Sequence, residues 1–433
     1  RYAALTQPQS LTLREIQKQV LNPWSLLLEY SLGEERSYLW VVSQNSISSF
    51  TLPKRSVIEA AAKRFYDATT ARNQFVQRES NQQKLDRVAE ADTESLKAAA
   101  ALSRLILSPA APLLGNKRLI VVADGALQYV PFAALPVGSR QLVSRHEIVS
   151  LPSATTLTVL RSESAQKAKA AKTVAVIADP VFESKDDRVK VVTIKAADGK
   201  APEKPETKDD KQVTTVESEP SRILLYKTAK DSGATDGEFR IPRLPNTRRE
   251  AETILSLAAG NSGKSVFDFA ANRAAATGED LSQYRILHFA THGFLNSLNP
   301  ELSGLVMSLV DEQGKPQNGY LLAPEIYNLK LPATELVVLS ACQTGLGKEV
   351  RGEGIVGLTR GFMYAGSPRV VVSLWSVNDR STADLMKYFY EALLAKSQRP
   401  AAALRAAQLE MLKQKQWQAP YFWAAFGLQG EWR

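Results

Sequence analysis

The sequence predicts an α/β fold in which helices flank a mostly parallel sheet, preceded by an α+β N-terminal region. From residue 173 onward, short apolar runs alternate with stretches of helical period, and strands that alternate with helices form parallel sheets through right-handed crossovers. Residues 25–52 instead alternate single apolar and polar side chains, which is typical of an antiparallel meander with one solvated face. These patterns divide the chain into regions at 1–152 and 173–433.

The N-terminal region is expected to combine the meander with two helices and a short strand. Residues 57–107 are rich in Ala, Leu, Lys, Arg and Glu and are interrupted near 79–82, which predicts two helices packed on the meander. A buried strand is expected at 119–122. The Asp124-Gly125 dipeptide that follows favours a tight hairpin, because glycine adopts positive φ without steric cost.

The C-terminal region begins with the continuous apolar run VAVIA at 174–178, which suits a parallel strand covered on both faces. Thr247 is the expected N-cap of the next helix, and Gly260 is its expected stop. The further strands are expected at 265–269, 285–293, 304–310, 335–345 and 369–375, and the further helices at 272–284, at 354–366 and from Ser381 and Pro400.

Residues 183–240 interrupt this alternation with a stretch that is dense in Lys, Asp, Glu, Pro and Thr. Because its few large apolar side chains cannot offset the entropy of ordering the backbone, we expect a mobile insertion. Mobile backbone is open to proteolysis, so self-cleavage within this stretch is one hypothesis and a solvated linker is the other.

Composition excludes several classes of protein. The net charge is +9, but the basic residues are interleaved with 45 acidic ones, so no nucleic-acid partner is expected. The longest apolar runs are about a third of the roughly 20 residues that cross a bilayer, so no membrane span is expected. A single cysteine excludes an intrachain disulfide. Because the chain begins at Arg1 we expect an excerpt or processed form, and the cytoplasm is the expected location.

Two residues suited to nucleophilic and acid–base chemistry follow expected strands, at the edge where parallel sheets gather functional groups. His292 ends one strand, and Cys342, the only cysteine, ends another 50 positions later. A thiol with an ordinary pKa of about 8.5 needs a neighbouring base to react near pH 7, and an adjacent strand would supply it. The main-chain N–H groups of Gly293 and Cys342 would hold the oxyanion of a tetrahedral intermediate. The alternative is that both side chains are packed core residues.

Two other kinds of site are not expected. His288 and His292 lie four positions apart, but no glutamate intervenes as in H-E-x-x-H, and the run is predicted as a strand rather than a helix. We therefore expect no metal, and we expect His288 to be packed and hydrogen-bonded. The glycine-rich stretch after residue 344 does not match a phosphate-binding loop, because Glu349 follows the lysine. No cofactor is implied.

Several motifs occur in an order that is similar to a known family. They are HFATHG (288–293), LSACQTG (339–345), RGEGIVGLTRGFMYAG (351–366), VVSLWSVND (371–379) and YFWAAFGLQG (421–430), preceded by SLLLEYSLGEERSYLWVV (25–42), LIVVADGALQYVPFAAL (119–135), IADPVF (177–182) and LPNTRREAE (244–252). Together they resemble the CHAT domain of bacterial type, a branch of the caspase, separase and gingipain clan of cysteine peptidases.

The resemblance implies a caspase-like α/β fold in the C-terminal region, and it implies a catalytic role for each of three residues. Cys342 would be the nucleophile, His292 the general base and acid of a dyad, and Gly293 an oxyanion-hole donor. It also implies a protein substrate and an upstream tetratricopeptide-type region or regulatory partner.

Substrate choice is expected to depend on a charged group in the specificity pocket. Asp379 ends a motif that resembles the separase segment facing a basic side chain, which implies Arg or Lys before the scissile bond. A buried ion pair discriminates strongly, because an uncharged competitor leaves it unpaired. Glu353 is a second candidate acid, and Trp375 is a candidate wall of the pocket.

Alternatives remain open at this point. Asp379 could instead cap the helix that starts near Ser381, and Arg243 or Arg248 could select acidic substrates, as the resemblance to caspases suggests. The sequence therefore predicts a cysteine endopeptidase, with a catalytically quiet CHAT module that binds protein partners as the alternative. A small-molecule hydrolase is a third reading, although no G-x-S-x-G elbow occurs.

Overall fold

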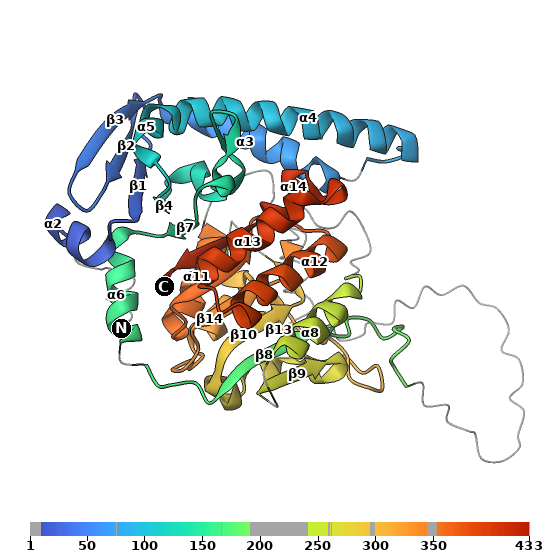
Figure 1. The fold of residues 1–433 in the computed structure, drawn as a ribbon. Coiled ribbons are helices and arrows are strands. Elements are labelled where there is room, and N and C mark those ends of the chain that lie inside the picture. Colours follow the sequence, from blue (N-terminus) through green and yellow to red (C-terminus); the bar gives the residue numbers. More distant parts are fainter. Residues whose placement is uncertain are drawn as a thin grey trace, which may run out of the picture.

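The computed structural model describes residues 10–74, 76–165, 167–190, 241–258, 260, 262–294, 299–340, 342–343 and 353–432, with the backbone alone at 300, 342–343 and 353–357. Within these residues, an 11-stranded sheet has the order β3-β2-β1-β4-β7-β17-β16-β14-β10-β8-β9. Figure 1 shows the sheet running from the blue N-terminal strands to β8 and β9. Its strands are β1 (Ser25–Ser31), β2 (Ser37–Val42), β3 (Ile47–Leu52), β4 (Arg118–Val122), β7 (Ile148–Leu151), β8 (Lys172–Ala178), β9 (Gly263–Phe267), β10 (Tyr284–Ala290), β14 (Leu336–Leu339), β16 (Arg369–Ser373) and β17 (Phe426–Gly430).

The sheet is mostly parallel, as expected. β1, β2 and β3 pair antiparallel and form the expected meander, and β17 is antiparallel to β16. The other described pairs of this sheet are parallel. β16, β14, β10, β8 and β9 therefore run in one direction, and their carboxyl ends lie along one edge, which is where an α/β fold places its functional groups. β4, β7 and β17 run in the opposite direction.

Helices cover both faces of the sheet. On one face α8, α12 and α13 lie side by side (Figure 1). Successive side chains of β10 point to opposite faces: His288 meets α8 and α12, whereas Phe289 packs on Phe362 of α11. The described helices include α2 (Leu13–Glu15), α3 (Arg55–Thr70), α4 (Asn81–Ile106), α5 (Ala111–Leu114), α6 (Ala154–Ser164), α8 (Asn246–Leu257), α9 (Arg273–Thr277), α10 (Ala323–Tyr327), α11 (Glu353–Ala365), α12 (Asp379–Tyr390), α13 (Pro400–Lys413) and α14 (Pro420–Trp423).

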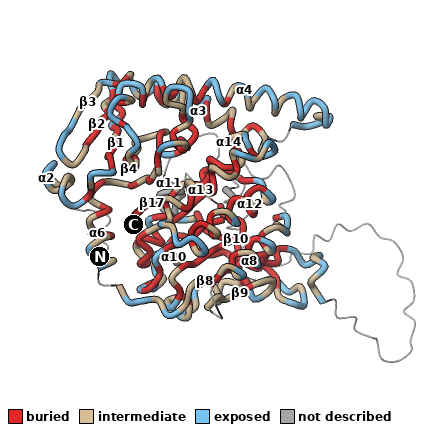
Figure 2. Tube along the Cα trace, viewed as in Figure 1, coloured by how far each residue is buried: buried red, intermediate tan, exposed pale blue. Residues whose placement is uncertain are grey.

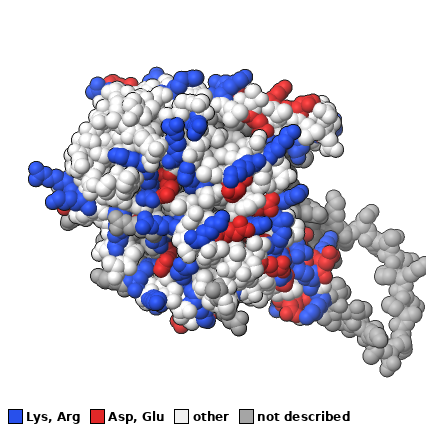
Figure 3. Space-filling model, in the orientation of Figure 1, with Lys and Arg blue, Asp and Glu red and all other residues white. Residues whose placement is uncertain are grey.

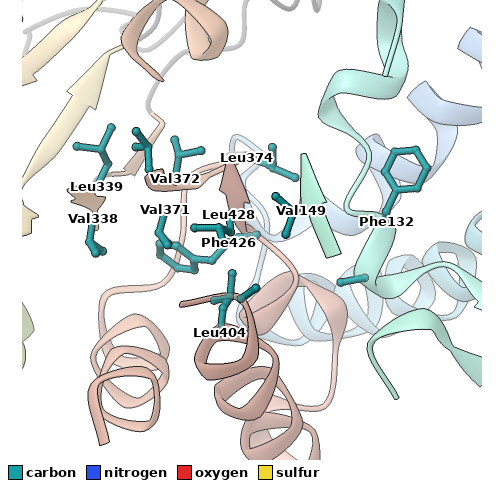
Figure 4. Close-up of a cluster of buried hydrophobic side chains, with 14 of the residues drawn as sticks. Phe132, Val149, Val338, Leu339, Val371, Val372, Leu374, Leu404, Phe426 and Leu428 are labelled. Carbon is teal, nitrogen blue, oxygen red and sulfur yellow. The ribbon is translucent and has the colours of Figure 1, made fainter. Parts of the chain in front are cut away.

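One hydrophobic core joins the two sequence regions. β17 pairs with β16 on one side and with β7 on the other, and Leu428 lies opposite both Val371 and Val149. Figure 4 shows these side chains together with Phe132 from the N-terminal region and Leu404 from α13. Figure 2 shows buried residues along the inner strands of the sheet, whereas the edge strand β3 is more exposed. The last strand of the chain thus completes the junction between the regions, which share a core.

Leu428→Ala is expected to lower the free energy of unfolding by about 2–5 kcal/mol, because it removes a buried side chain that is 1% exposed and leaves a cavity. Since the core is shared, denaturant unfolding followed by circular dichroism should remain one transition that moves as a whole. Gln429→Ala, at the half-buried next position, is the control and should change stability by less than about 0.5 kcal/mol. Two transitions, of which only one moves, would contradict the shared core.

Two local expectations are wrong. Gly125 has the expected positive φ of +55°, but it begins the 3₁₀ turn Gly125–Tyr129 instead of a hairpin. The Asp124 carboxylate accepts hydrogen bonds from the Leu32 N–H (2.7 Å) and from Arg55 (3.3 Å), which ties this point to the end of β1. Thr247 does not cap α8: the helix begins at Asn246, and the Thr247 hydroxyl donates to the Leu244 carbonyl at 2.7 Å.

Most of the expected insertion, residues 191–240, lies outside the described residues. Its first part, 183–190, is described, and there Arg188 forms ion pairs with Asp186 and Asp268 at 2.8 Å each. On the face drawn in Figure 3, basic and acidic side chains are interspersed. Among the helices of the described part, none has the length and hydropathy to cross a bilayer.

Candidate active site

The candidate site lies beyond the ends of β10 and β14, at the carboxyl edge of the sheet. Within the described ranges, a second sheet has the order β13-β12-β11-β15, with β11 (His292–Phe294), β12 (Gly304–Val306), β13 (Tyr320–Leu322) and β15 (Cys342–Gln343). β10 stops at Ala290, and the buried Thr291 donates its hydroxyl hydrogen to the Val306 carbonyl in β12. At this hydrogen bond the chain passes from the large sheet to the small one. The single strand expected at 285–293 is therefore two strands.

The small sheet brings His292 and Cys342 to adjacent positions. β11 and β15 are parallel, and His292 lies directly opposite Cys342 in their register. Paired strands are about 4.8 Å apart, so the backbone of the cysteine lies beside that of the histidine. The side chain of Cys342 is outside the described residues.

The His292 imidazole is held in one tautomer by a main-chain carbonyl. Its Nε2 lies 2.7 Å from the Pro242 oxygen, and since a carbonyl only accepts, Nε2 carries the proton of the neutral ring. Nδ1 then presents a lone pair, and it is buried without a hydrogen-bond partner among the described residues. The Phe182 ring packs against the imidazole with 5.2 Å between centroids. The geometry thus offers Nδ1 as an unprotonated base.

The surroundings of His292 also favour its neutral form. The residue is 4% exposed, and this burial lowers its pKa below the ordinary 6.5. The Pro242 carbonyl and the negative charge of Asp379 act in the opposite direction but do not cancel the effect of burial. At neutral pH the imidazole is therefore ready to accept a proton.

NMR titration of Cys342→Ala should give a His292 pKa below 6.5, since this variant removes a thiol whose titration would couple to the imidazole. The chain has three histidines, which makes assignment direct. The His292 imidazole binds a proton at higher pH in the unfolded chain than in the folded one. The contribution of neutral His292 to the free energy of unfolding is therefore fully present above pH 6.5 and is lost as the pH falls toward the folded-state pKa. A His292 pKa above 6.5 would contradict this environment.

Asp379 lies close enough to influence the titration of His292, and it does not cap its helix. Asn378 is the N-cap of α12, and its side chain accepts from the Ser381 N–H at 3.0 Å. Asp379 is half-buried, and its Oδ2 accepts from the N–H (3.0 Å) and the side-chain amide (2.8 Å) of Asn246. Within the described part of the chain, Oδ1 has no hydrogen-bonding or ion-pair partner. The alternative of a capping role for Asp379 is thus wrong.

Arg243 and Arg248 are both engaged by acids of the protein itself. The Arg243 guanidinium forms a two-pronged pair with Asp179, with distances of 2.8 and 2.7 Å. Arg248 donates to both oxygens of Asp268 at 2.6 Å and lies over the Phe267 ring. Both cations already have an acidic partner within the protein, and a substrate carboxylate would have to displace it.

The structure places the remaining candidates as follows. Gly293 is buried in β11, between β12 and β15. Trp375 is 1% exposed, and its indole N–H donates to the Tyr421 carbonyl at 3.1 Å, so the ring is buried in the core. Glu353 is the first residue of α11, and its side chain lies outside the described residues.

His288 is packed and hydrogen-bonded. Its Nε2 donates to Glu250 of α8 at 2.7 Å, and its Nδ1 lies 2.9 Å from the hydroxyl of Tyr390 in α12. All three side chains are buried, and burial, followed by the Glu250 charge, raises the pKa of Tyr390. With both ring nitrogens occupied, His288 joins α8, β10 and α12 rather than serving as a ligand.

Sequence reasoning assigned no role to Pro242 or Asp179. Pro242 acts through its main-chain carbonyl, which no side-chain pattern reveals. The sequence could have pointed to Asp179, because it is a carboxylate directly after an apolar strand, at the edge where functional groups gather.

Comparison with known proteins gives the following similarities. A family model described as CHAT domain matches residues 96–431. The human protein named Tetratricopeptide repeat protein 28 is 36% identical over 110 residues, which are 25% of this chain and 4% of the human one. Two crystal structures of the Saccharomyces cerevisiae separase–securin complex match with TM-scores of 0.58 and 0.56 at 9% and 11% identity, over 96% of this chain and 30% and 31% of theirs.

The chain thus spans a small part of its curated relative and under a third of the separase chain. At such low identity the separase match concerns the fold alone, and it agrees with the mixed, mostly parallel sheet and its flanking helices. The fold is the caspase-like α/β fold.

Proposed function

This chain belongs to the CHAT domain family, and from that membership we propose that it is a cysteine-type endopeptidase. The observation that carries the proposal is the buried Nδ1 of His292, which has no hydrogen-bond partner among the residues the structure describes and lies on a strand whose register sets Cys342 directly opposite. A base nitrogen kept unprotonated beside the only cysteine of the chain suits nucleophilic catalysis by a thiol.

In the proposed reaction, Nδ1 of His292 takes the proton from the Cys342 thiol, and the sulfur attacks the carbonyl carbon of the scissile peptide bond. The Pro242 carbonyl stabilises the imidazolium that forms, because it already accepts the Nε2 hydrogen. When the C–N bond breaks, Nδ1–H protonates the leaving amine and a thioester remains. His292 then deprotonates a water that hydrolyses the thioester, which returns the free thiol. The main-chain N–H groups of Gly293 and Cys342 are the proposed oxyanion donors.

We propose that Asp379 selects Arg or Lys before the scissile bond. Its Oδ1 has no partner among the described residues, and its charge reaches His292, so it is near the proposed chemistry. The opposite preference is disfavoured because Arg243 and Arg248 are already paired with Asp179 and Asp268. Glu353 stays a second candidate acid.

Labelling by an irreversible, thiol-directed peptidyl electrophile tests the proposal. Because the chain has one cysteine, covalent adduct formation detected by mass spectrometry reports on Cys342 alone. We expect the native protein to be labelled much faster than the denatured chain, and His292→Ala to suppress this advantage. Equal rates for native and denatured protein would argue against an activated thiol.

The second candidate function is a catalytically quiet module that binds protein partners. The observation that favours it is the burial of His292, which is 4% exposed and so leaves a substrate little access in this conformation. A thiol that stays unreactive in the folded protein, with peptides of every charge, would support this function. A tetratricopeptide-type region in the same polypeptide is a further proposal, supported by the name of the human relative.

A further inference from the structure

The carbonyl that orients His292 belongs to a segment with no regular structure. Residues 241–244 form neither helix nor strand, and no main-chain hydrogen bond to another backbone group holds 241–243 in the described part of the protein. The Ile241 side chain is buried in a small apolar cluster with Phe182 and Phe294. Position 242 therefore depends on side-chain contacts at 241 and 243.

The strongest of these contacts is the ion pair between Arg243 and Asp179. Arg243 donates from Nε to Oδ1 (2.8 Å) and from Nη2 to Oδ2 (2.7 Å), the parallel geometry that gives arginine–carboxylate pairs both strength and direction. The Asp179 side chain is fully buried, so water competes little for it. Asp179 also has a φ of +50°, a left-handed conformation that non-glycine residues adopt rarely.

Asp179 is fixed to the strand next to that of the histidine. It directly follows β8, whose last residue Ala178 pairs with Ala290 of β10, two positions before His292. Its own carbonyl accepts a hydrogen bond from Arg188 at 2.8 Å. A continuous chain of contacts thus connects the imidazole, through Pro242, Arg243 and Asp179, to β8, which pairs with the strand that precedes His292.

We propose that Asp179 and Arg243 are positioning residues for His292. By fixing the segment around Pro242, their ion pair keeps the carbonyl on Nε2 and leaves Nδ1 as the nitrogen without a proton. The catalytic consequence rests on the proposed peptidase function, whereas the effect on the tautomer does not.

Arg243→Gln tests this inference with little risk to the fold. Asp179 would still be paired with Arg188 (3.1 Å) and Arg248 (3.3 Å), so its buried charge would not be left alone. Arg249→Gln is the matched control: it also removes an arginine, but Arg249 lies within α8 and pairs with Asp384 at 2.7 Å rather than with Asp179.

The direct readout is the tautomer of His292 in ¹⁵N-labelled protein, where the three histidines give three resolvable spin systems. We expect the Nε2–H tautomer in the wild type and in Arg249→Gln, and a mixture of tautomers in Arg243→Gln. An unchanged tautomer in Arg243→Gln, or an equal disturbance in both variants, overturns the inference. This result stands whether or not the protein cleaves peptides.

The second readout is cleavage. Arg243→Gln should lower kcat by about 10- to 100-fold, the usual effect of losing a group that orients a functional residue, with little change in KM. Arg243→Lys, which keeps the charge but not the planar guanidinium that binds both carboxylate oxygens, should restore part of the loss, and Arg249→Gln should stay within about threefold of the wild type. An Arg243→Gln enzyme with wild-type kcat overturns the inference, and a wild type without cleavage refutes the proposed function while the tautomer still decides the positioning role.

Discussion

Replacing His292 by alanine is expected to lower kcat for peptide cleavage by about 10²- to 10⁴-fold, the usual contribution of a positioned acid–base group. The loss has two causes, since the same Nδ1 is proposed to take the thiol proton and to protonate the leaving amine. Single-turnover cleavage of a fluorogenic peptide measures the chemical step without interference from product release.

The sequence offers a matched control in His146. This residue is also buried, and burial also lowers its pKa. Its Nδ1 lies 2.7 Å from the Lys117 carbonyl, as Nε2 of His292 lies 2.7 Å from the Pro242 carbonyl. His146→Ala should therefore carry a similar cost in stability but leave kcat of the folded protein within about threefold. An equal loss of kcat in both variants would mean that stability, rather than chemistry at Nδ1, accounts for the effect.

Asp379→Asn is expected to lower kcat/KM for substrates with Arg or Lys before the scissile bond by about 10²- to 10³-fold, since losing one partner of a buried charge pair costs about 2–5 kcal/mol. Glutamine at the same substrate position should be cleaved at a nearly unchanged rate. The substitution also removes a charge that raises the pKa of His292, so the acid limb of the pH profile should move to lower pH.

Asp384→Asn is the control for this prediction. Asp384 lies on the same helix, where it pairs with Arg249 at 2.7 Å and accepts from the Trp417 indole N–H at 3.1 Å. Its loss should leave substrate preference unchanged. If Asp379→Asn also leaves it unchanged, Glu353→Gln is the next variant to test. A wild-type preference for acidic residues would instead refute the role of Asp379 and direct attention to Arg243 and Arg248.

The sequence predicts those parts of the fold that depend on local pattern. Apolar alternation marks β1, β2 and β3, and the continuous run at 174–178 marks a strand buried on both faces. The break between β10 and β11 is not predictable in this way, because the segment HFATHG contains no turn signal before its final glycine. The hydrogen bond at the end of β10 joins Thr291 to Val306, 15 positions away. The hairpin expected at Asp124-Gly125 fails for the same reason, since Asp124 bonds to Leu32 and Arg55.

The candidate site also contains residues that local sequence patterns predict and residues that they do not. His292 and Cys342 stand out because each follows an apolar strand, and parallel strands bring their ends to one edge. Pro242 and Asp179 act on the imidazole through contacts that span 50 and 64 positions of the chain. Such contacts appear only when the chain is folded, and one of them uses the main chain, which every residue has.

A crystal structure of the protein trapped with a thiol-directed peptidyl electrophile tests the dyad most directly. The proposed chemistry requires the Cys342 sulfur within about 4 Å of His292 Nδ1, with the Pro242 carbonyl still on Nε2. A sulfur on the other side of the small sheet, or one separated from the imidazole by packed side chains, would contradict the dyad and leave a binding module as the function.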